Sequence, residues 1–187
     1  MQVLHIHPDQ VKLIVLTHSH FDHAGSAKEI KDYTGARILI HETEKEFLEG
    51  GGFIMPKGTT TMGRLTRFLF FPFFKRIKFN RPKADITIGD EDFSLSDYGI
   101  DGSVIYTPGH THGSLSVLLK TGEIFAGCLA HNGFPFRSKP GLPIYAEDIN
   151  EVKESWKKLI NMGAKFVFPG HGKPFSIDVI KKELSVG

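Results

Sequence analysis

The chain has 187 residues, of which 40% are hydrophobic and 24% charged, and its 23 Lys and Arg nearly balance its 21 Asp and Glu. This length suits a single domain, residues 1–187, with a sizeable core. The balanced charge gives no reason to expect a nucleic acid partner. No apolar run approaches the roughly 18 residues of a membrane span, and no charged-then-apolar leader begins the chain. We therefore expect a cytoplasmic protein without a membrane partner.

The first notable segment is "THSHFDHAG", residues 17–25, which follows the apolar run "VKLIVL" at 11–16. The run predicts a buried strand. Residues two apart in an extended segment point the same way, so His18, His20 and Asp22 should converge while His23 starts a turn. Imidazole and carboxylate groups suit divalent zinc, iron or manganese. Because so short a segment cannot surround one ion, two ions that also take ligands from distant loops are the easier solution.

The next elements complete a strand, helix, strand unit. Ser26 as a possible N-cap, Glu29 three residues later and Gly35 as a stop predict a helix over 27–34. The run "ARILIH" at 36–41 then predicts a second strand.

Residues 64–79, "RLTRFLFFPFFKRIKF", carry six of the sixteen phenylalanines among basic residues. Pro72 is expected to break any long helix here. We favour phenylalanines that cover the core and line a pocket, because buried aromatics are the usual case. A membrane-surface segment and an aromatic, basic platform for nucleic acid are the alternatives. The surrounding residues, 50–83, are expected to form a substrate loop or lid.

From residue 85 onward, short strands separated by Gly89-Asp90, Asp101-Gly102 and Thr121-Gly122 predict a β-meander. A helix over 148–163 follows, with Asp148 and Glu151 as a capping box. Three further candidate ligands each come just after a predicted strand: His110 after "SVIYT", Cys128 after "EIF" and His171 after "KFVF". A rigid sheet can hold side chains so placed at one site.

Together, "THSHFDH", "TPGHTHGS" and "PGHG" resemble the signature motifs of the metallo-β-lactamase fold hydrolases, in the same order and from about residue 10 to 175. The resemblance implies an α/β (α+β) fold, a four-layer αββα sandwich with a dinuclear site at the edge between its two sheets. It also implies that His18, His20 and His110 bind a first metal ion, and that Asp22, His23 and His171 bind a second.

Cys128 stands where most dinuclear hydrolases of this family have a bridging aspartate. Either the thiol fills space and the second site is weakened, or it is a thiolate ligand, as in the lactamase branch, where a similar "GGC" cysteine binds the second zinc. Thiolate is a soft ligand that favours zinc over iron or manganese, so we expect one or two zinc ions. His131 falls where that branch has a basic residue for the substrate carboxylate.

The sequence before the motif is shorter than in most of the family, which places several strands ahead of it. Here only "MQVLHIHPDQVKLIVL" precedes it, so the sandwich is expected to lack some N-terminal strands. Their absence would leave a sheet edge with unpaired backbone groups. Misassigned or lost N-terminal sequence is the favoured explanation, and a homodimer that covers the edge or a relic domain are the others.

The expected chemistry is attack by a zinc-activated hydroxide on a carbonyl, with Asp22 orienting the nucleophile or passing its proton to the leaving group. The sequence thus predicts a metal-dependent hydrolase of a small-molecule ester, thioester, lactone or amide, similar to glyoxalase II and lactonases. A β-lactamase is an alternative that the cysteine favours. A catalytically impaired metal-binding or interaction remnant of the fold is the other.

Overall fold

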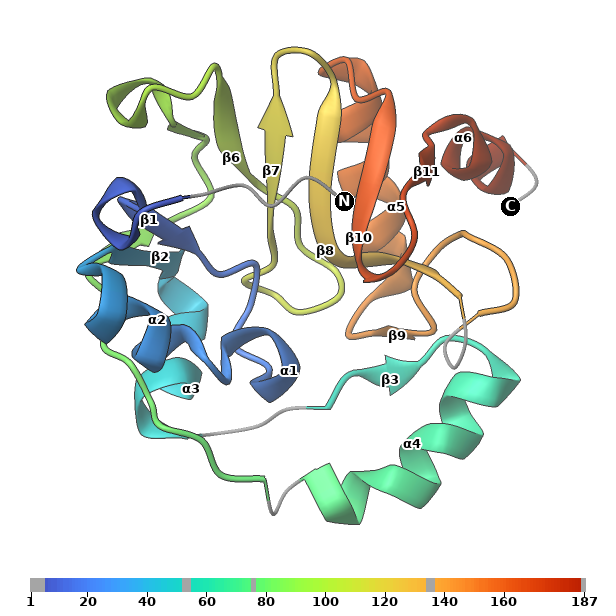
Figure 1. Ribbon diagram of the computed structural model, residues 1–187. Helices are drawn as coiled ribbons and strands as arrows, with labels where there is room; N and C mark the ends of the chain where they lie inside the picture. Colours follow the sequence, from blue (N-terminus) through green and yellow to red (C-terminus); the bar gives the residue numbers. More distant parts are fainter. Residues whose placement is uncertain (1–5, 52–54, 75–76, 134–136, 186–187) are drawn as a thin grey trace.

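The computed structural model describes residues 6–51, 55–74, 77–133 and 137–185. Two β-sheets lie face to face, and helices cover the outer face of each (Figure 1). The elements are η1 Pro8–Gln10, β1 Leu13–Val15, α1 Phe21–Ala24, α2 Ala27–Thr34, β2 Arg37–His41, α3 Glu42–Gly50, β3 Lys57–Gly58, α4 Thr61–Phe74, β4 Ile86–Ile88, β5 Phe93–Ser94, η2 Ser96–Tyr98, β6 Gly102–Tyr106, β7 Leu115–Leu119, β8 Glu123–Asn132, β9 Tyr145–Ala146, α5 Ile149–Asn161, β10 Phe166–Gly172, β11 Phe175–Ser176 and α6 Asp178–Ser185.

The smaller sheet is parallel and has the order β1-β2-β4. Its central strand β2 is apolar at successive positions because both of its faces are covered. Ile38 and Ile40 pack with residues of α1, α2 and α3, whereas Leu39, pointing the other way, packs against the larger sheet. The alternation of β2 therefore places one helical layer and one sheet on opposite sides.

The larger sheet has the order β11-β10-β8-β7-β6-β5. Strands β5 to β8 form the predicted antiparallel meander, and β10 returns parallel to β8. Val104 of β6 joins the core between the sheets, and its neighbour Ile105 joins the core under α5. A sheet whose two faces are both apolar requires a layer on each side, which completes the order αββα. The predicted four-layer sandwich is confirmed.

Helix α5 seals the outer face of the larger sheet and agrees with the predicted helix. The side chain of Asp148 accepts hydrogen bonds from the N–H groups of Asn150 and Glu151, so the N-cap forms as expected. The reciprocal half of the predicted capping box does not form, because the N–H of Asp148 donates to the carbonyl of Gly109 at 3.0 Å. Trp156 is fully buried, and its Nε1–H donates to the carbonyl of Leu129 in β8 at 2.9 Å. That bond satisfies the indole's one polar group while the ring fills the core.

Two local predictions at the N-terminal side of the fold have different outcomes. Helix α2 has the predicted bounds and ends at Gly35, whose φ is +72°. The predicted cap is wrong, because the Ser26 side chain makes no capping hydrogen bond and Glu29 instead accepts from Asn80 at 2.7 Å.

Residues 86–88 are not part of the meander. They form β4, which pairs in parallel with β2 in the smaller sheet. Gly89-Asp90 therefore carries the chain from one sheet to the other instead of closing a hairpin. Thr121-Gly122, in contrast, does join the antiparallel strands β7 and β8, with Gly122 at φ +106°.

The prediction that Pro72 breaks any long helix in the aromatic segment is wrong. Helix α4 continues through Pro72 to Phe74. Proline lacks an N–H and its ring crowds the carbonyl four residues earlier, but so near the end of a helix both costs fall on the last turn. Among the described residues, no helix combines the length and the apolarity needed to cross a lipid bilayer. Strands β1 and β4 are the edges of the smaller sheet, and a homodimer that covers such an edge stays a prediction.

Candidate metal centre

The loop after β1 holds the first two histidines and is tied down on both sides. The carbonyl of Thr17 accepts from the N–H of Leu115 in the larger sheet at 2.8 Å. On the other side, the N–H and Oγ of Ser19 donate to Oε2 of Glu44 at 2.9 and 2.5 Å. His18, between these two anchors, is fully buried. Hydrogen bonds therefore attach this loop to strand β7 of the larger sheet on one side and to helix α3 on the other.

The alternation predicted for this segment ends at His20. Helix α1 begins at Phe21, so Asp22 and His23 lie in its first turn instead of an extended segment and a turn. Both side chains nevertheless reach the same region. Oδ2 of Asp22 lies 3.7 Å from Nε2 of His23 and 3.2 Å from Nε2 of His171.

His110 lies in the loop after β6, as predicted. Its Nδ1 is 2.9 Å from the carbonyl oxygen of Tyr145, and a carbonyl can only accept, so Nδ1 carries the proton. The lone pair is then on Nε2, which lies 3.3 Å from Nδ1 of His20. A hydrogen bond from a ring N–H to a backbone carbonyl, such as the one from His110 to Tyr145, typically orients imidazoles that bind metals.

Cys128 and His171 were expected just beyond strands, and both instead lie within them, in β8 and β10. These strands run on past the predicted ends with shifts of register, and Gly127 has φ +51° at the irregularity. Such a bulge turns the next side chain to a new direction. Nε2 of His23 consequently lies 3.1 Å from Sγ of Cys128 and 3.3 Å from Nε2 of His171.

All seven predicted ligands are brought to one region. The donor atoms of His18, His110 and Cys128 lie within 4.8 Å of one another, and so do those of His23, Cys128 and His171. His20 belongs to the first group by its 3.3 Å approach to His110, and Asp22 belongs to the second by its approach to His171. Cys128 belongs to both groups, so its sulfur lies within reach of the first group as well as of the second, to which it was assigned.

Three of the histidines, His18, His23 and His110, are neutral in this arrangement. Burial holds the pKa of His18 and that of His110 well below the usual value, and nearby imidazoles lower both further. Burial lowers the pKa of His23 to about 4, although the Asp22 carboxylate opposes the shift. A neutral imidazole has the lone pair that a metal ion requires.

The two acidic groups respond in opposite directions. Burial raises the pKa of Asp22, but the hydrogen bond from His171 and the electrostatic influence of the nearby His23 and His171 rings outweigh it, so that pKa lies well below the usual range. Burial and the Asp22 charge raise the pKa of the Cys128 thiol well above its usual value. A cation at the sulfur would reverse this shift and release the thiol proton.

The polar atoms here fit a divalent cation. Nε2 of His18 is buried and has no hydrogen-bond partner among the described residues. A buried nitrogen left in this state costs free energy that a bound cation recovers. Imidazole, carboxylate and thiol groups are together a typical zinc ligand set.

A cavity of about 340 Å³ opens over these groups. Its floor includes His20, Asp22, His110, Cys128 and His171, and its walls are mostly apolar, formed by Phe21, Met55, Pro56, Phe70, Ile144 and Tyr145 with Thr66. Met55, Pro56, Thr66 and Phe70 come from the segment 50–83 that was expected to form a substrate loop; residues 52–54 and 75–76 of it lie outside the described part of the chain. A cavity that combines a polar floor with apolar walls is typical of small-molecule sites.

His131 also lines this cavity, 5.5 Å from His171 between ring centroids. Burial lowers the pKa of His131 to about 3, and its Nδ1 accepts from the N–H of Ile144 at 3.4 Å. A neutral imidazole carries no charge for a carboxylate. The position of His131 therefore fits contact with a substrate, whereas its state does not fit the basic role expected from the lactamase branch.

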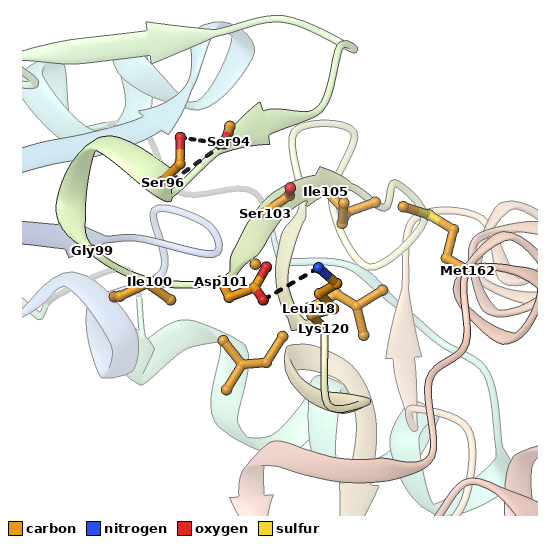
Figure 2. Close-up of a pocket in the computed structure, with 12 residues that line it drawn as sticks. Ser94, Ser96, Gly99, Ile100, Asp101, Ser103, Ile105, Leu118, Lys120 and Met162 are labelled. Carbon is orange, nitrogen blue, oxygen red and sulfur yellow. Dashed lines mark hydrogen bonds and ion pairs between the residues drawn. The ribbon is translucent and has the colours of Figure 1, made fainter.

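A larger hollow of about 600 Å³ lies elsewhere, against β5, β6 and β7, and contains none of the predicted ligands (Figure 2). Its charged groups are Asp101 and Lys120, whose Oδ2 and Nζ are 3.5 Å apart and largely exposed. Exposed ion pairs of this kind contribute little. The larger hollow therefore lacks the predicted metal ligands, five of which line the smaller cavity.

Sequence reasoning missed the residues that hold the ligands in place. Glu44 anchors the His18 loop, Thr17 Oγ1 lies 3.0 Å from Nδ1 of His18, and the Tyr145 carbonyl fixes His110. None of these residues stands in a sequence motif or at a regular spacing from the ligands that would have indicated its role. Gly127 is different, because a glycine inside a strand pattern signals a bulge.

Comparison with known proteins agrees with this geometry. The sequence model of the metallo-beta-lactamase superfamily matches residues 1–171. The probable metallo-hydrolase YflN of Bacillus subtilis is 27% identical over 195 residues, which cover 94% of this chain and 70% of YflN.

Two further proteins extend the comparison. The crystal structure of ST1585, a metallo-beta-lactamase superfamily protein of Sulfolobus tokodaii, superimposes with a TM-score of 0.64 at 24% identity and covers 95% of this chain and 68% of that one. A hydroxyacylglutathione hydrolase of Pelagibacter ubique is 24% identical over 118 residues, which cover 63% of this chain and 35% of that enzyme. The chain thus spans about two thirds or less of these relatives.

Replacing Gly127 with alanine is expected to weaken metal binding. The new Cβ would lie 2.6 Å from Oγ1 of Thr17, which contacts His18, and φ +51° is itself strained for alanine. We expect at least a tenfold weaker zinc affinity and a loss of about 1–2 kcal/mol in free energy of unfolding. Gly99→Ala is the control, because Gly99 has φ +72° but open space around it. Equal zinc affinity of the two variants by calorimetry would refute the expectation.

The metal-free protein is expected to lose stability as the pH falls from 7.5 to 5. The folded-state pKa values of His23 and His131, about 4 and about 3, lie below the usual value of 6.5 for an exposed histidine. The stability they contribute is therefore fully present above pH 6.5 and is lost as the pH falls toward the folded values. At pH 5, each of these two histidines is expected to lower the free energy of unfolding by about 2 kcal/mol relative to pH 7.5. Urea unfolding in chelator should show this slope, reduced in His131→Gln and unchanged in the exposed control His7→Gln; a flat profile would contradict it.

Proposed function

The chain belongs to the metallo-beta-lactamase superfamily, and from that premise we propose that it is a zinc-dependent hydrolase of a small ester, thioester, lactone or amide. The observation that carries the proposal is that seven ligand side chains meet in one region, and that five of them form the floor of an apolar-walled cavity: His20, Asp22, His110, Cys128 and His171. Members of this superfamily bind metal ions, and YflN is named a probable metallo-hydrolase.

The ligands are proposed to act in two sets. His18, His20 and His110 hold one ion, and Asp22, His23 and His171 hold the other. Cys128 lies within reach of both sets, and as the softest donor it favours zinc over iron or manganese. Binding of the second ion depends more on the Cys128 thiol than binding of the first does, because the second set, Asp22, His23 and His171, has a single carboxylate and no bridging aspartate.

An ion in this position supplies two things: it lowers the pKa of water, and it polarises a carbonyl oxygen. The chain's own residues do the rest. Asp22 is a carboxylate at neutral pH, so its Oδ2 can accept a proton from the attacking water and return it to the leaving group. Nε2 of His171 lies 3.2 Å from that oxygen, so the two groups are adjacent ligands of the second set.

The cavity wall determines what can enter. Phe21, Phe70, Ile144 and Met55 exclude water and offer apolar contact, which suits the acyl part of a substrate. A volume of about 340 Å³ is at the small end for ligand cavities. The hydroxyacylglutathione hydrolase among the relatives makes a thioester the first substrate to test.

A β-lactamase is the second candidate, and the cysteine in the metal cluster is the observation that favours it. The neutral state of His131 weighs against it, because a β-lactam carboxylate needs a cationic partner. Hydrolysis of a chromogenic cephalosporin that exceeds hydrolysis of thioesters and lactones would favour this alternative.

Metal content and turnover test the proposal together. We expect the purified protein to contain one to two zinc equivalents by elemental analysis and to hydrolyse an acylglutathione thioester, an aryl ester or a lactone. Cys128→Asp is expected to change the stoichiometry or the turnover, because it exchanges a soft ligand for a hard, bridging one. A folded protein that holds no metal and is inert would instead be a remnant of the fold.

Asp22→Asn is expected to lower kcat by about 10²–10⁴, because the amide oxygen cannot accept a proton. At least one zinc equivalent should remain, since His18, His20 and His110 are untouched. Steady-state kinetics with the best substrate measures the effect, and the exposed Asp97→Asn serves as the matched control. Wild-type kcat in Asp22→Asn would remove the carboxylate from the proton transfer.

A further inference from the structure

Helix α4 turns its polar and small residues toward the protein. The hydroxyl of Thr66 bonds to the Tyr145 hydroxyl, and Nε of Arg67 donates to the Pro56 carbonyl at 3.1 Å. Gly63 packs so closely that a Cβ there would lie 2.2 Å from the carbonyl oxygen of Ile144. One face of the helix is therefore fixed to the body by hydrogen bonds and close backbone packing.

The opposite face of α4 is apolar and exposed. Met62, Leu65 and Leu69 follow one another at helical spacing, and Phe68 and Phe73 flank them with 80% and 63% of their surfaces accessible. We call these five residues the outer stripe. Figure 1 shows α4 at the periphery, with β3 between it and the sheets. This orientation is the reverse of an ordinary surface helix, which buries its apolar face.

The chain segment that carries the outer stripe has charges of one sign. Between residues 50 and 84 the sequence contains no Asp or Glu, and its eight basic residues are Lys57, Arg64, Arg67, Lys75, Arg76, Lys78, Arg81 and Lys83. Arg64 and Lys78 are exposed. An apolar stripe within a purely basic segment matches a surface that is both apolar and negatively charged.

We propose that the outer stripe docks α4 onto an anionic lipid surface. The stripe enters the boundary between headgroups and acyl chains while the basic side chains meet the headgroups. A second copy of the chain fits less well, because a two-fold contact through α4 would bring two basic segments together. The proposed docking is peripheral, and it differs from the expectation of no membrane partner.

The same helix also forms part of the cavity wall. Thr66 and Phe70 line the cavity over the metal ligands, so docking through the outer stripe would place that wall beside the lipid. Lipid binding itself requires neither the metal ions nor the hydrolase activity. Its outcome is therefore independent of the proposed function.

Vesicle flotation of the whole chain tests the docking. We expect the protein to float with vesicles of equal parts phosphatidylcholine and phosphatidylglycerol, and much less with phosphatidylcholine alone or in 0.5 M salt. The double variant Leu65→Ser/Phe68→Ser should lose at least tenfold in partition coefficient, and Arg64→Ser about fivefold. Tyr33→Ser, which removes an aromatic ring 76% exposed on α2, should bind as the wild type does.

Circular dichroism and thermal unfolding establish that each variant is folded, since the changed side chains lie on the outside. Absence of binding to the anionic vesicles, or equal binding by the double variant, would overturn the proposal. So would a wild-type dimer that ignores vesicles and dissociates in the double variant, because the occupant would then be a second copy.

Discussion

The site depends on the desolvation of a group of imidazoles that are buried in contact with one another. His18 and His110 are buried, and His23 nearly so, within a few ångströms of each other. Removing polar nitrogens from water is costly unless something replaces the lost hydrogen bonds. Protonation cannot do so, because burial and neighbouring rings oppose a charge on each. A divalent cation can, and it would also draw the proton from the Cys128 thiol.

The stacked sheets make this arrangement possible. The His18 loop leaves the smaller sheet, whereas His110, Cys128 and His171 come from the larger one, so the ligands meet only where the two sheets end side by side. Glu44 and the Thr17 carbonyl bind the loop to its neighbours, and the bulge at Gly127 turns Cys128 toward it. These supports position the ligands before a metal arrives, which is how a rigid scaffold makes a precise site.

The sequence was most informative where spacing carries physical meaning. The end of helix α2 followed from Gly35, helix α5 from its N-cap Asp148, and the four layers from the resemblance that the motifs carry; all seven candidate ligands meet. Prediction failed where distant contacts decide. The predicted alternation does not reach Asp22, because helix α1 begins at Phe21. Strand β4 pairs with β2 instead of joining the meander. Strands β8 and β10 continue beyond the apolar runs from which they were predicted. The support from Glu44 and the outward apolar face of α4 depend on partners far away in the chain.

The most direct test of the account is anomalous X-ray scattering at the zinc edge from crystals grown with zinc. We expect a peak about 2.0–2.1 Å from Nε2 of His18, with His20 and His110 completing its shell, and a second peak of equal or lower occupancy near His23, His171 and Cys128. Zinc found only at other positions, with these side chains left without it, would contradict the account.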